Sequence, residues 1–434
     1  MLSLHRGQAG NAGYLRDSEV IPVNSRTISF LVIPQRPAFV ASTLLALAAL
    51  LLVSCGGGAS GTGEVGPDQS PDLLVQSADT PMDGEITTDG LSDSEETLTG
   101  DPGPRIPGEW EPQAATWMQW PTAWEASLRP DFGRIIAMVQ LYQPVHLLVL
   151  DGSLEQDARQ HIGSAGGDPD KVVYHQLAYD NSWMRDNGPV YAIQDGELVV
   201  LDWGFDAWGG NFGNDIPYAA DDSIPNKLAG FLGQPVLDFG DYVLERGNLE
   251  ANGAGTVVLG WDCQADRNPG WDETATNELL AERLGATQVV WIRGHDPLDL
   301  TTGHIDGIVR FVDETTVAVA RSLIPGDPNA VLMEDAAQVL AQAGFQVVRI
   351  DAPGLVPYKG EQLPAIYMNW LVGNGFVAAM AFGKSDWDAA ARATFEGLFP
   401  GRKVHMIETL ELWYNGGGIH CVTNDQPAMP PSLP

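Results

Sequence analysis

The chain has 434 residues, and its 57 acidic and 23 basic residues give a formal net charge of −34. That length suffices for one large domain or two to three ordinary ones. The sequence holds no Lys/Arg cluster, so we expect no nucleic-acid partner. An acidic field instead attracts small cations such as amines and guanidinium compounds, although solubility alone would also explain it. The three cysteines, Cys55, Cys263 and Cys421, are too few and too far apart for a disulfide framework or a cysteine-based zinc site, and we expect no metal and no cofactor.

The N-terminal 54 residues predict export. Four arginines precede an apolar run over residues 38–53, which is a little short for a membrane-spanning helix of about 20 residues. A basic flank, an apolar centre and small residues after it are typical of a secretory signal peptide, here residues 1–54. The end of the run, LVSC at 52–55, resembles the lipobox of bacterial lipoproteins, which implies cleavage before Cys55 and lipidation of its thiol. We therefore expect a protein that is exported and lipid-anchored to the outer or plasma membrane of a bacterial envelope; an ordinary signal peptide or a single anchor helix is the alternative.

Residues 55–104 are predicted to form an acidic, disordered tether. No Lys or Arg occurs from Gly56 to Pro104, while Asp and Glu recur among Gly, Ser, Thr and Pro. Such a segment does not bury enough apolar surface to order itself, and its charges repel one another. It would hold the globular part, expected over residues 105–434, away from the membrane.

The globular part predicts a repeated unit of β-hairpin, helix and single strand. The strongest signal is the Asp195-Gly196 turn between residues 189–193 and 197–202. Further hairpins are predicted at residues 244–251 with 255–259, 305–312 with 316–320, and 368–372 with 376–381. Helices are predicted at residues 224–232, 273–284, 330–343 and 387–398, and single strands at 288–292, 346–350 and 404–406. The hairpins recur about every 50–65 residues, somewhat longer than the periods typical of repeat folds.

Polar residues fall at equivalent ends of these units. They precede the first hairpin, start the second, open the third, and enter the last strand. In chain order they are Asp186, Glu245, His304 with Asp306, and Cys421. Each alone has an ordinary structural explanation, such as a turn residue, a surface charge, a core histidine or a buried cysteine. Together they predict one site, because equivalent ends of repeated units can converge on a common axis.

Three glycines at 416–418 lead into Cys421, with His420 beside it. Glycine lets the backbone enter positive φ and approach a ligand closely. A thiol presented on such backbone next to a histidine is a candidate nucleophile for a small substrate. The alternative is a glycine turn before an edge strand with a buried cysteine.

Side chains of these kinds suit hydrolysis of a guanidinium C–N bond. Two carboxylates around a planar cation make paired, charge-assisted hydrogen bonds, the geometry that guanidinium prefers. A thiolate below the central carbon can attack it, and the bound cation favours that thiolate by lowering its pKa from about 8.5. A histidine can donate a proton to the departing amine and then accept one from the incoming water. The products would be ammonia and a urea-type compound, formed through a covalent thiouronium intermediate, and no metal is required.

Eight short segments, in order from about residue 114 to 427, carry a family resemblance. They are WMQWP at 117–121, WMRDNGP at 183–189, DWGFDAWGG at 202–210, LERGN at 244–248, RNP at 267–269, TGHIDG at 302–307, Asn369 with GNG at 373–375, and GGGIHC at 416–421. On these segments the chain resembles the agmatine deiminase and bacterial peptidylarginine deiminase family of guanidino-group-modifying enzymes. The resemblance implies a five-bladed α/β propeller, the pentein fold of pseudo-fivefold ββαβ units, and makes residues 105–434 a deiminase domain.

The resemblance also implies roles for the site residues. Cys421 would be the nucleophile and His304 the general acid and base. Asp186 and Asp306 would bind the guanidinium nitrogens, and Glu245 would orient and polarise His304.

Other residues receive weaker assignments from the resemblance. Trp183 and Trp208 would wall the alkyl stem of the substrate, with core packing as the alternative. Gly417 and Gly418 are candidate substrate-binding residues. Cys263 falls where the family has an interior strand and is expected to be structural.

Departures from the family pattern bear on the substrate. The family usually has Glu-Gly-Gly where this chain has Glu245-Arg246-Gly247, so Arg246 would either point outward or reach the mouth of the site. The peptidylarginine type carries arginines for a substrate carboxylate where this chain has AWGG at 207–210, which is similar to the agmatine type. We expect conversion of agmatine to N-carbamoylputrescine and ammonia, as in polyamine and putrescine metabolism. A peptidyl- or free-arginine deiminase giving citrulline is the alternative, and export favours it.

Two rival functions share part of this prediction. A lipid-anchored protein that binds guanidino or amine compounds without turning them over would need the carboxylates alone. An amidinotransferase would use the same chemistry with an acceptor amine in place of water. A papain-like peptidase is disfavoured, since that family places its cysteine near the mature N-terminus.

Overall fold

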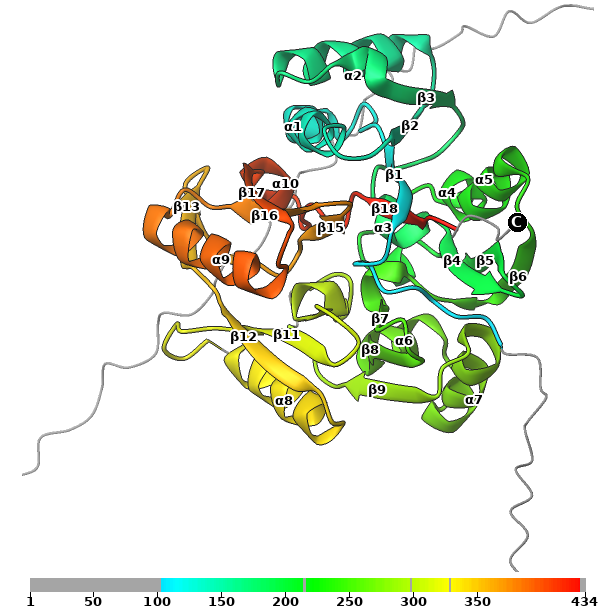
Figure 1. Ribbon diagram of the computed structural model, residues 1–434, viewed down its shortest axis with the longest axis vertical. Coiled ribbons are helices and arrows are strands. Elements are labelled where there is room, and N and C mark those ends of the chain that lie inside the picture. The colour runs from blue at the N-terminus through cyan, green and yellow to red at the C-terminus, as the bar shows by residue number, and fades with distance from the viewer. Residues whose placement is uncertain (1–102, 214–215, 297–298, 328, 430–434) are drawn as a thin grey trace, which may run out of the picture. The chain divides into compact units, whose positions relative to one another are not determined.

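A computed structural model describes residues 103–213, 216–296, 299–327 and 329–429 (Figure 1). The predicted signal peptide, the lipidation of Cys55 and nearly all of the predicted tether lie outside the described residues. Within the described ranges, no helix combines the length and apolarity needed to cross a membrane.

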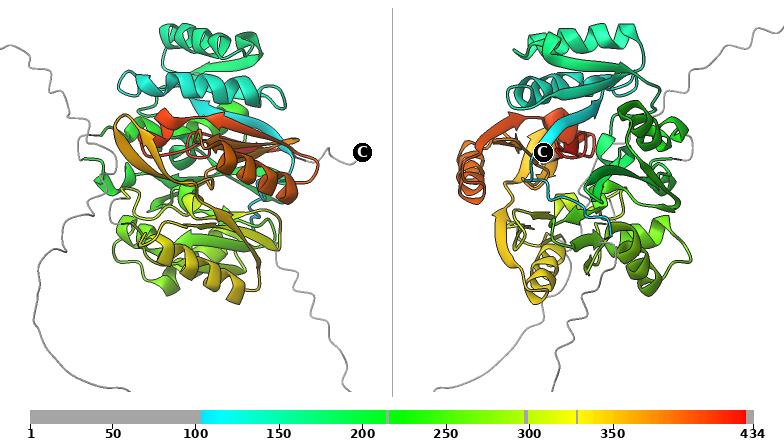
Figure 2. Two further views of the ribbon diagram at one scale, coloured as in Figure 1. Left: turned by 90° about the vertical axis from the view of Figure 1, so that its left-hand side faces the viewer. Right: turned by 45° about the vertical axis from the view of Figure 1, so that its right-hand side comes forward.

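Four three-stranded sheets share one pattern, in which two antiparallel strands are followed by a strand parallel to the second. The first two sheets are β4 (Val190–Gln194), β5 (Glu197–Gly204) and β6 (Val236–Val243), then β7 (Glu250–Ala251), β8 (Thr256–Gly260) and β9 (Gln288–Ile292). The next two are β10 (Val309–Phe311), β11 (Thr316–Arg321) and β12 (Gln346–Asp351), then β15 (Leu371–Gly373), β16 (Phe376–Ala381) and β17 (Lys403–Glu408). The parallel crossovers carry the helices α5 (Ile224–Leu232), α7 (Glu273–Leu284), α8 (Asn329–Gln342) and α9 (Ser385–Leu398). In Figure 2 the yellow α8 and the orange α9 each lie along strands of neighbouring colour.

A fifth sheet joins the two ends of the described chain. Its strand order is β18-β1-β2-β3, with β1 (Gln113–Gln119), β2 (Val145–Val149), β3 (Val172–Gln176) and β18 (Asn424–Pro427). The helices α1 (Arg129–Val139) and α2 (Gly152–Ser164) connect its parallel strands. Strand β18, red in Figure 1, pairs antiparallel with the cyan β1, with Trp117 opposite Asn424. This pairing fixes the backbone a few residues after Cys421.

Local sequence explains the elements that were predicted well. The β4–β5 hairpin turns at Asp195 (φ 53°) and Gly196 (φ 78°), a left-handed pair that the Asp-Gly dipeptide favours. Helix α5 begins with Pro225 in its first turn and ends at Gly233 in the left-handed conformation. The predicted bounds of α5, α7 and β9 are confirmed, and those of α8, α9, β12 and β17 agree within two residues.

The leading strands of the later hairpins were predicted too long. In place of a strand from residue 244, the chain forms a 3₁₀ turn, η4 (Arg246–Asn248), and only the short β7 follows. A second 3₁₀ turn, η5 (Ile305–Gly307), stands where the third hairpin was expected to begin. Both turns are closed by backbone hydrogen bonds, of Asn248 N–H to Glu245 C=O and of Ile308 N–H to Ile305 C=O. Because these backbone groups hydrogen-bond within the turns, they do not pair with a neighbouring strand.

The sequence analysis did not predict β1, β2, β3, α1 and α2 of the fifth sheet, nor strand β6. It also missed the hairpin β13 (Gly354–Tyr358) with β14 (Glu361–Ala365) and the short helices α3 (Met184–Asn187), α4 (Ala219–Asp222), α6 (Trp261–Arg267) and α10 (Leu410–Tyr414). Two expectations are wrong in position. Cys263 lies on α6 and not on an interior strand, and Cys421 lies in a turn three residues before β18.

Candidate active site

The five predicted site residues lie in short turns that lead into strands. Asp186 is in α3 ahead of β4, Glu245 immediately precedes η4, and His304 immediately precedes η5, which contains Asp306. Direct contacts join Cys421 to Asp306, and His304 to Glu245 and Asp186. The two groups lie close enough for the charges of Asp186, Asp306 and His304 to affect one another, as the predicted convergence of equivalent strand ends requires.

The thiol of Cys421 sits between an amide and a carboxylate. Asn369 Nδ2 donates a hydrogen bond to Sγ at 3.1 Å, and Sγ lies 3.6 Å from Asp306 Oδ2. The backbone N–H of Cys421 donates to Asn369 Oδ1 at 3.2 Å, so one amide side chain holds both the thiol and its backbone. Burial, Asp306 and Asp186 together raise the pKa of the Cys421 thiol well above its usual value. The thiol is therefore held protonated by these surroundings.

His304 and Glu245 form a buried pair. His304 Nε2 lies 2.6 Å from Glu245 Oε2, and its Nδ1 lies 3.6 Å from Asp186 Oδ1. Burial alone would lower the pKa of His304, but the carboxylates of Asp186 and Glu245 outweigh it and hold that pKa well above its usual value. The imidazole is thus charged at neutral pH and able to act as a proton donor.

Glu245 is held in place by an arginine that the sequence analysis did not assign to the site. Arg267 donates from Nε to Oε1 at 2.8 Å and from Nη2 to Oε2 at 3.2 Å. Burial would raise the pKa of Glu245, but hydrogen bonds and charge from His304 and Arg267 keep it below its usual value. Glu245 therefore remains an acceptor for His304 across the physiological range.

Asp186 differs from the other site carboxylates in its titration. It accepts hydrogen bonds from Trp208 Nε1 at 2.9 Å and from the Gly247 N–H at 3.0 Å. Burial raises the pKa of Asp186 to about 6, against the opposing effect of His304. Asp306, by contrast, has a pKa below its usual value: burial would raise it, but hydrogen bonding and charge from His420 outweigh that effect.

Glycines permit close packing at the site. A Cβ at Gly247 would lie 2.5 Å from Asp186 Oδ1 and from His304 Nδ1, and a Cβ at Gly417 would lie 2.3 Å from the Trp183 ring. A Cβ at Gly418 would lie 2.4 Å from Asn369 Oδ1. Of the three glycines before Cys421, only Gly416 adopts a positive φ (100°). Gly417 and Gly418 are needed because a side chain at either position would collide with its neighbours.

The two predicted tryptophans border these groups. Trp208 is 4% exposed and stands on a left-handed stretch, with Ala207 and Trp208 both at φ 58°. Its indole N–H is directed at Asp186, and its ring packs in a small cluster with Phe205 and the half-buried Trp183. Such a conformation is unfavourable for residues with a Cβ and persists only where surrounding contacts enforce it.

Arg246 does neither of the two things expected of it. It is buried, and Nη2 pairs with Asp425 Oδ2 at 2.9 Å while Nη1 donates to Asn424 Oδ1 at 3.2 Å. Both partners belong to β18. The extra side chain in the Glu-Arg-Gly segment thus points toward the end of the chain and binds it, away from His304 and Cys421.

Two groups of side chains in the described part of the chain have the spacing of a metal site. They are Glu245 with Cys263 and His304, and Glu109 with Glu250 and His420. Each carries a protein cation already, Arg267 on Glu245 and Arg310 on Glu109 and Glu250. The carboxylates of both groups are therefore already paired with arginine.

The residues that the sequence analysis left unassigned are Asn369, Arg267, Glu109 and His420. Asn369 had a detectable signal, because it begins the fourth predicted hairpin just as Asp186 and Asp306 begin theirs. Glu109 had none, as it lies in an irregular segment before β1 and reaches His420 Nε2 at 2.6 Å across 311 positions of sequence.

Comparison with known proteins places this combination of sheets and site in one family. The chain matches the Porphyromonas-type peptidyl-arginine deiminase family over residues 105–427 and belongs to that family. It is similar to the agmatine deiminase of Pseudomonas aeruginosa, with 29% identity over 360 residues that cover 75% of this chain and 96% of the relative.

Solved structures of related proteins agree with this assignment. The agmatine deiminase of Enterococcus faecalis is 26% identical, with a TM-score of 0.67 over 77% of this chain and 100% of that one. The agmatine deiminase of C. jejuni has a TM-score of 0.67 at 21% identity over 75% of this chain and 97% of that one, a likeness that concerns the fold alone. The mixed α/β fold and the family expected from the sequence are confirmed.

Proposed function

We propose that the protein hydrolyses the guanidino group of agmatine, giving N-carbamoylputrescine and ammonia. One observation carries the proposal: Sγ of Cys421 lies 3.6 Å from Asp306, His304 lies 3.6 Å from Asp186, and both carboxylates are near enough to raise the pKa of the thiol, so a thiol, a proton donor and two carboxylates are neighbours. Two carboxylates of this kind suit a planar cation. Family membership and the similarity to agmatine deiminases support the same reaction.

The first half of the reaction forms a covalent intermediate. A guanidinium between Asp186 and Asp306 offsets the two charges that hold the thiol protonated, so Cys421 loses its proton to solvent and its sulfur attacks the central carbon. The charged His304 then donates its proton to one departing amino group, which leaves as ammonia. The carbon remains bound to sulfur as a thiouronium cation.

The second half releases the product. Neutral His304, kept in orientation by Glu245, accepts a proton from a water molecule as its oxygen attacks the same carbon. The C–S bond breaks, the new hydroxyl group loses its proton to solvent, the thiolate returns, and a substituted urea departs. Asn369 Nδ2 stabilises the sulfur whenever it is negative, because it donates to Sγ at 3.1 Å.

Peptidyl or free arginine is the second candidate substrate. The family model names the peptidyl-arginine type, which favours it. The stretch AWGG at 207–210 supplies no cation for a substrate carboxylate, while Asp206 and Asp266 flank Arg267 at the outer side of Glu245. This local excess of acidic groups favours a substrate with a free amine, and we place agmatine first. Trp183 and Trp208 would then wall its alkyl stem.

An ammonia-release assay with agmatine, arginine and an arginyl peptide tests the proposal. Ammonia from at least one substrate, abolished in Cys421→Ser protein, is the expected result. Binding measured by calorimetry without ammonia or ureido product would instead indicate a non-catalytic binding protein. A new guanidino product when glycine or ornithine is supplied would indicate an amidinotransferase.

The proposal also covers the arrangement of the sheets and the place of the protein in the cell. The four ββαβ sheets and the β18–β1 sheet support a five-bladed propeller in which the site lies at the centre. We also propose export and a lipid anchor at Cys55. Metabolic labelling with a fatty acid analogue, lost in Cys55→Ser protein, tests that anchor.

A further inference from the structure

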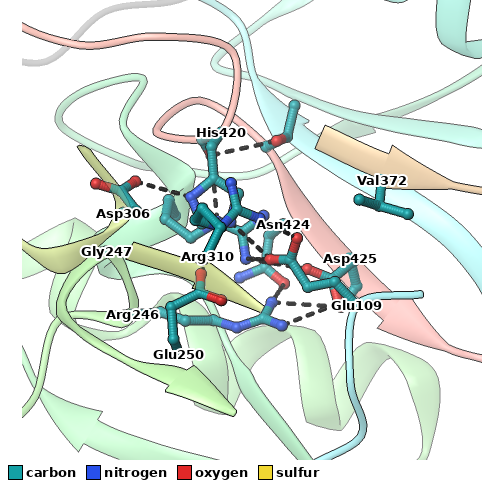
Figure 3. Close-up of polar contacts among 12 residues, drawn as sticks. Glu109, Arg246, Gly247, Glu250, Asp306, Arg310, Val372, His420, Asn424 and Asp425 are labelled. Carbon is teal, nitrogen blue, oxygen red and sulfur yellow. Dashed lines mark hydrogen bonds and ion pairs between the residues drawn. The ribbon is translucent and has the colours of Figure 1, made fainter. Parts of the chain in front are cut away.

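A buried polar network extends from Asp306 through His420 to Glu109 (Figure 3). His420 stands at its centre, with Nδ1 2.7 Å from Asp306 Oδ2 and Nε2 2.6 Å from Glu109 Oε1. Its imidazole is 1% exposed. An imidazole that faces two ionised carboxylates donates to both only when it carries both of its protons.

The charge of Glu109 is fixed by two arginines. Arg185 Nη1 lies 3.0 Å from Glu109 Oε1, and Arg310 forms an ion pair with the other oxygen. Burial would raise the pKa of Glu109, but Arg310, His420 and Arg185 hold it well below its usual value. Glu109 therefore stays negative and attracts the proton on His420 Nε2.

Further charged side chains extend the network. Arg310 Nε lies 2.5 Å from Glu250 Oε1, and Asp425 lies between Arg185 and Arg246, at 3.0 and 2.9 Å. Four acidic groups, counting Asp306, thus face three arginines and His420. Arg185 also donates to the backbone carbonyls of His420 (from Nε) and Cys421 (from N–H), at 3.2 and 3.1 Å, which holds the thiol-bearing turn.

Asp306 is used by this network through one oxygen only. Among the residues that the structure describes, its side-chain hydrogen bonds, from Asn369, His420 and Cys421, all end on Oδ2. Oδ1 is thereby left for a bound cation. Loss of the His420 donor would free Asp306 to rotate and to take up a proton.

We propose that His420 and Glu109 are positioning residues, which hold Asp306 ionised and with Oδ1 directed at the guanidinium of the substrate. This inference rests on the proposed function for the identity of the substrate. Glu109 and His420 do not touch the reacting atoms; they act through Asp306. Their arrangement parallels the Arg267–Glu245–His304 series on the other side of the site.

Variants that separate the two nitrogens of His420 test the proposal. His420→Asn places an amide nitrogen near the position of Nδ1 and keeps a donor for Asp306, whereas His420→Gln reaches toward Glu109 and loses that donor. Glu109→Gln keeps the hydrogen-bond acceptor and removes the charge. We expect His420→Gln and Glu109→Gln to raise KM for agmatine about tenfold, the effect of one charge-assisted hydrogen bond, with kcat changed less than about threefold. Their acid limb of kcat/KM should move to higher pH, and His420→Asn should stay nearer wild type.

A matched control separates positioning from stability. Asp131 is another buried carboxylate, 1% exposed and bonded to the Leu412 N–H, but it has no contact with the site. Asp131→Asn should lower the melting temperature at most and leave KM and the pH profile unchanged. Wild-type KM and pH profile in His420→Gln and Glu109→Gln, whatever their stability, would overturn the proposal.

A measurement on Cys421→Ser protein keeps the test independent of the folding of those variants and of turnover. Binding of guanidinium ion, at concentrations far below denaturing ones, is followed by calorimetry from pH 7 to pH 4.5. If Asp306 stays ionised, the loss of affinity at low pH follows the protonation of one group in the free protein, Asp186, whose pKa lies near 6. Uptake of two protons would show that Asp306 titrates as well and would overturn the inference. Wild-type protein that releases no ammonia from any guanidino substrate would refute the proposed function without altering this result.

Discussion

The amide nitrogen of Asn369 donates to two groups at once, Sγ of Cys421 at 3.1 Å and Oδ2 of Asp306 at 2.9 Å. Asn369 begins a predicted hairpin, as Asp186 and Asp306 do, yet it is neutral. Its contribution is a donor that strengthens when sulfur becomes negative, because hydrogen bonds to charged acceptors are the stronger ones.

Replacing Asn369 with alanine should therefore make the thiolate harder to form. We expect the pKa of Cys421 to rise and kcat for agmatine to fall about 10- to 100-fold, the range seen when a donor to a developing negative charge is removed. The rate of iodoacetamide alkylation across pH reports the thiolate directly. Asn277 on α7 is the control, since its amide oxygen accepts a hydrogen bond from Trp291 Nε1 on β9. Asn277→Ala should leave the alkylation rate and kcat unchanged. An unaltered alkylation profile in Asn369→Ala would contradict the role.

Asp306→Asn should separate thiol reactivity from turnover. Asp306 raises the pKa of Cys421, so removing its charge lowers that pKa and increases the thiolate fraction near pH 7. We expect faster alkylation of Cys421 together with a loss of about 100-fold or more in kcat/KM, because the cationic substrate loses a charged partner. Slower or unchanged alkylation would show that Asp306 does not govern the thiol.

Substrate affinity should depend on pH through Asp186. Its pKa is raised to about 6, so its carboxylate is charged above that value and becomes neutral as the pH falls below it. KM for a guanidino substrate should accordingly rise as the pH falls through about 6, and Asp186→Asn should abolish this dependence along with most of the affinity. Asp202→Asn is the matched control: burial raises the pKa of Asp202 to about 6 as well, but the residue is on β5 and does not contact the site. A KM profile that Asp202→Asn alters and Asp186→Asn preserves would reverse the assignment.

Glu245→Gln should shift the basic limb of the rate profile. Glu245 and Asp186 together hold the pKa of His304 above its usual value, and the charged imidazole is the proton donor to the leaving amine. Without the Glu245 charge the pKa of His304 falls, so the descending limb of kcat should move by about 1 to 2 pH units to lower pH. Steady-state rates from pH 6 to pH 10 measure it. A descending limb at the wild-type position would mean that another group donates the proton.

Arg246→Ala should affect stability without affecting substrate binding. Asp425 would keep Arg185 but lose Arg246, and we expect the free energy of unfolding to fall by about 2 to 3 kcal/mol. KM should stay within about twofold of wild type, since Arg246 binds β18 and does not face the substrate. Urea denaturation and KM provide the two readings. The exposed Arg293–Glu273 pair offers a comparison, because Arg293→Ala should change stability by less than about 0.5 kcal/mol.

The elements that could be predicted are those whose own residues specify them. Asp195-Gly196 dictates a hairpin turn, and Pro225 with Gly233 brackets a helix, so these bounds followed from local chemistry. Strand β18 is different. Its sequence, NDQP at 424–427, has no strand character, and it forms a strand because its backbone pairs with β1. Pairing between the two ends of the described chain leaves no local pattern.

The site shows the same division. Asp186, Glu245, His304, Asp306 and Cys421 could be selected because they recur at one position of a repeated unit. Arg267 and Glu109 occupy no such position, and they became visible only through their contacts with Glu245 and His420. Arg246 could be recognised as a departure from the family pattern, but its direction depended on where Asp425 lies.

The pairing of β18 with β1 has a consequence for how the protein is made. Cys421 is synthesised three residues ahead of a strand whose docking partner left the ribosome some 300 residues earlier. A polypeptide that ends between residues 421 and 424 contains every acidic group of the site, but its Cys421 is not yet anchored by β18. Translation thus supplies the sulfur after every acidic group of the site, and the last strand to be made completes its placement.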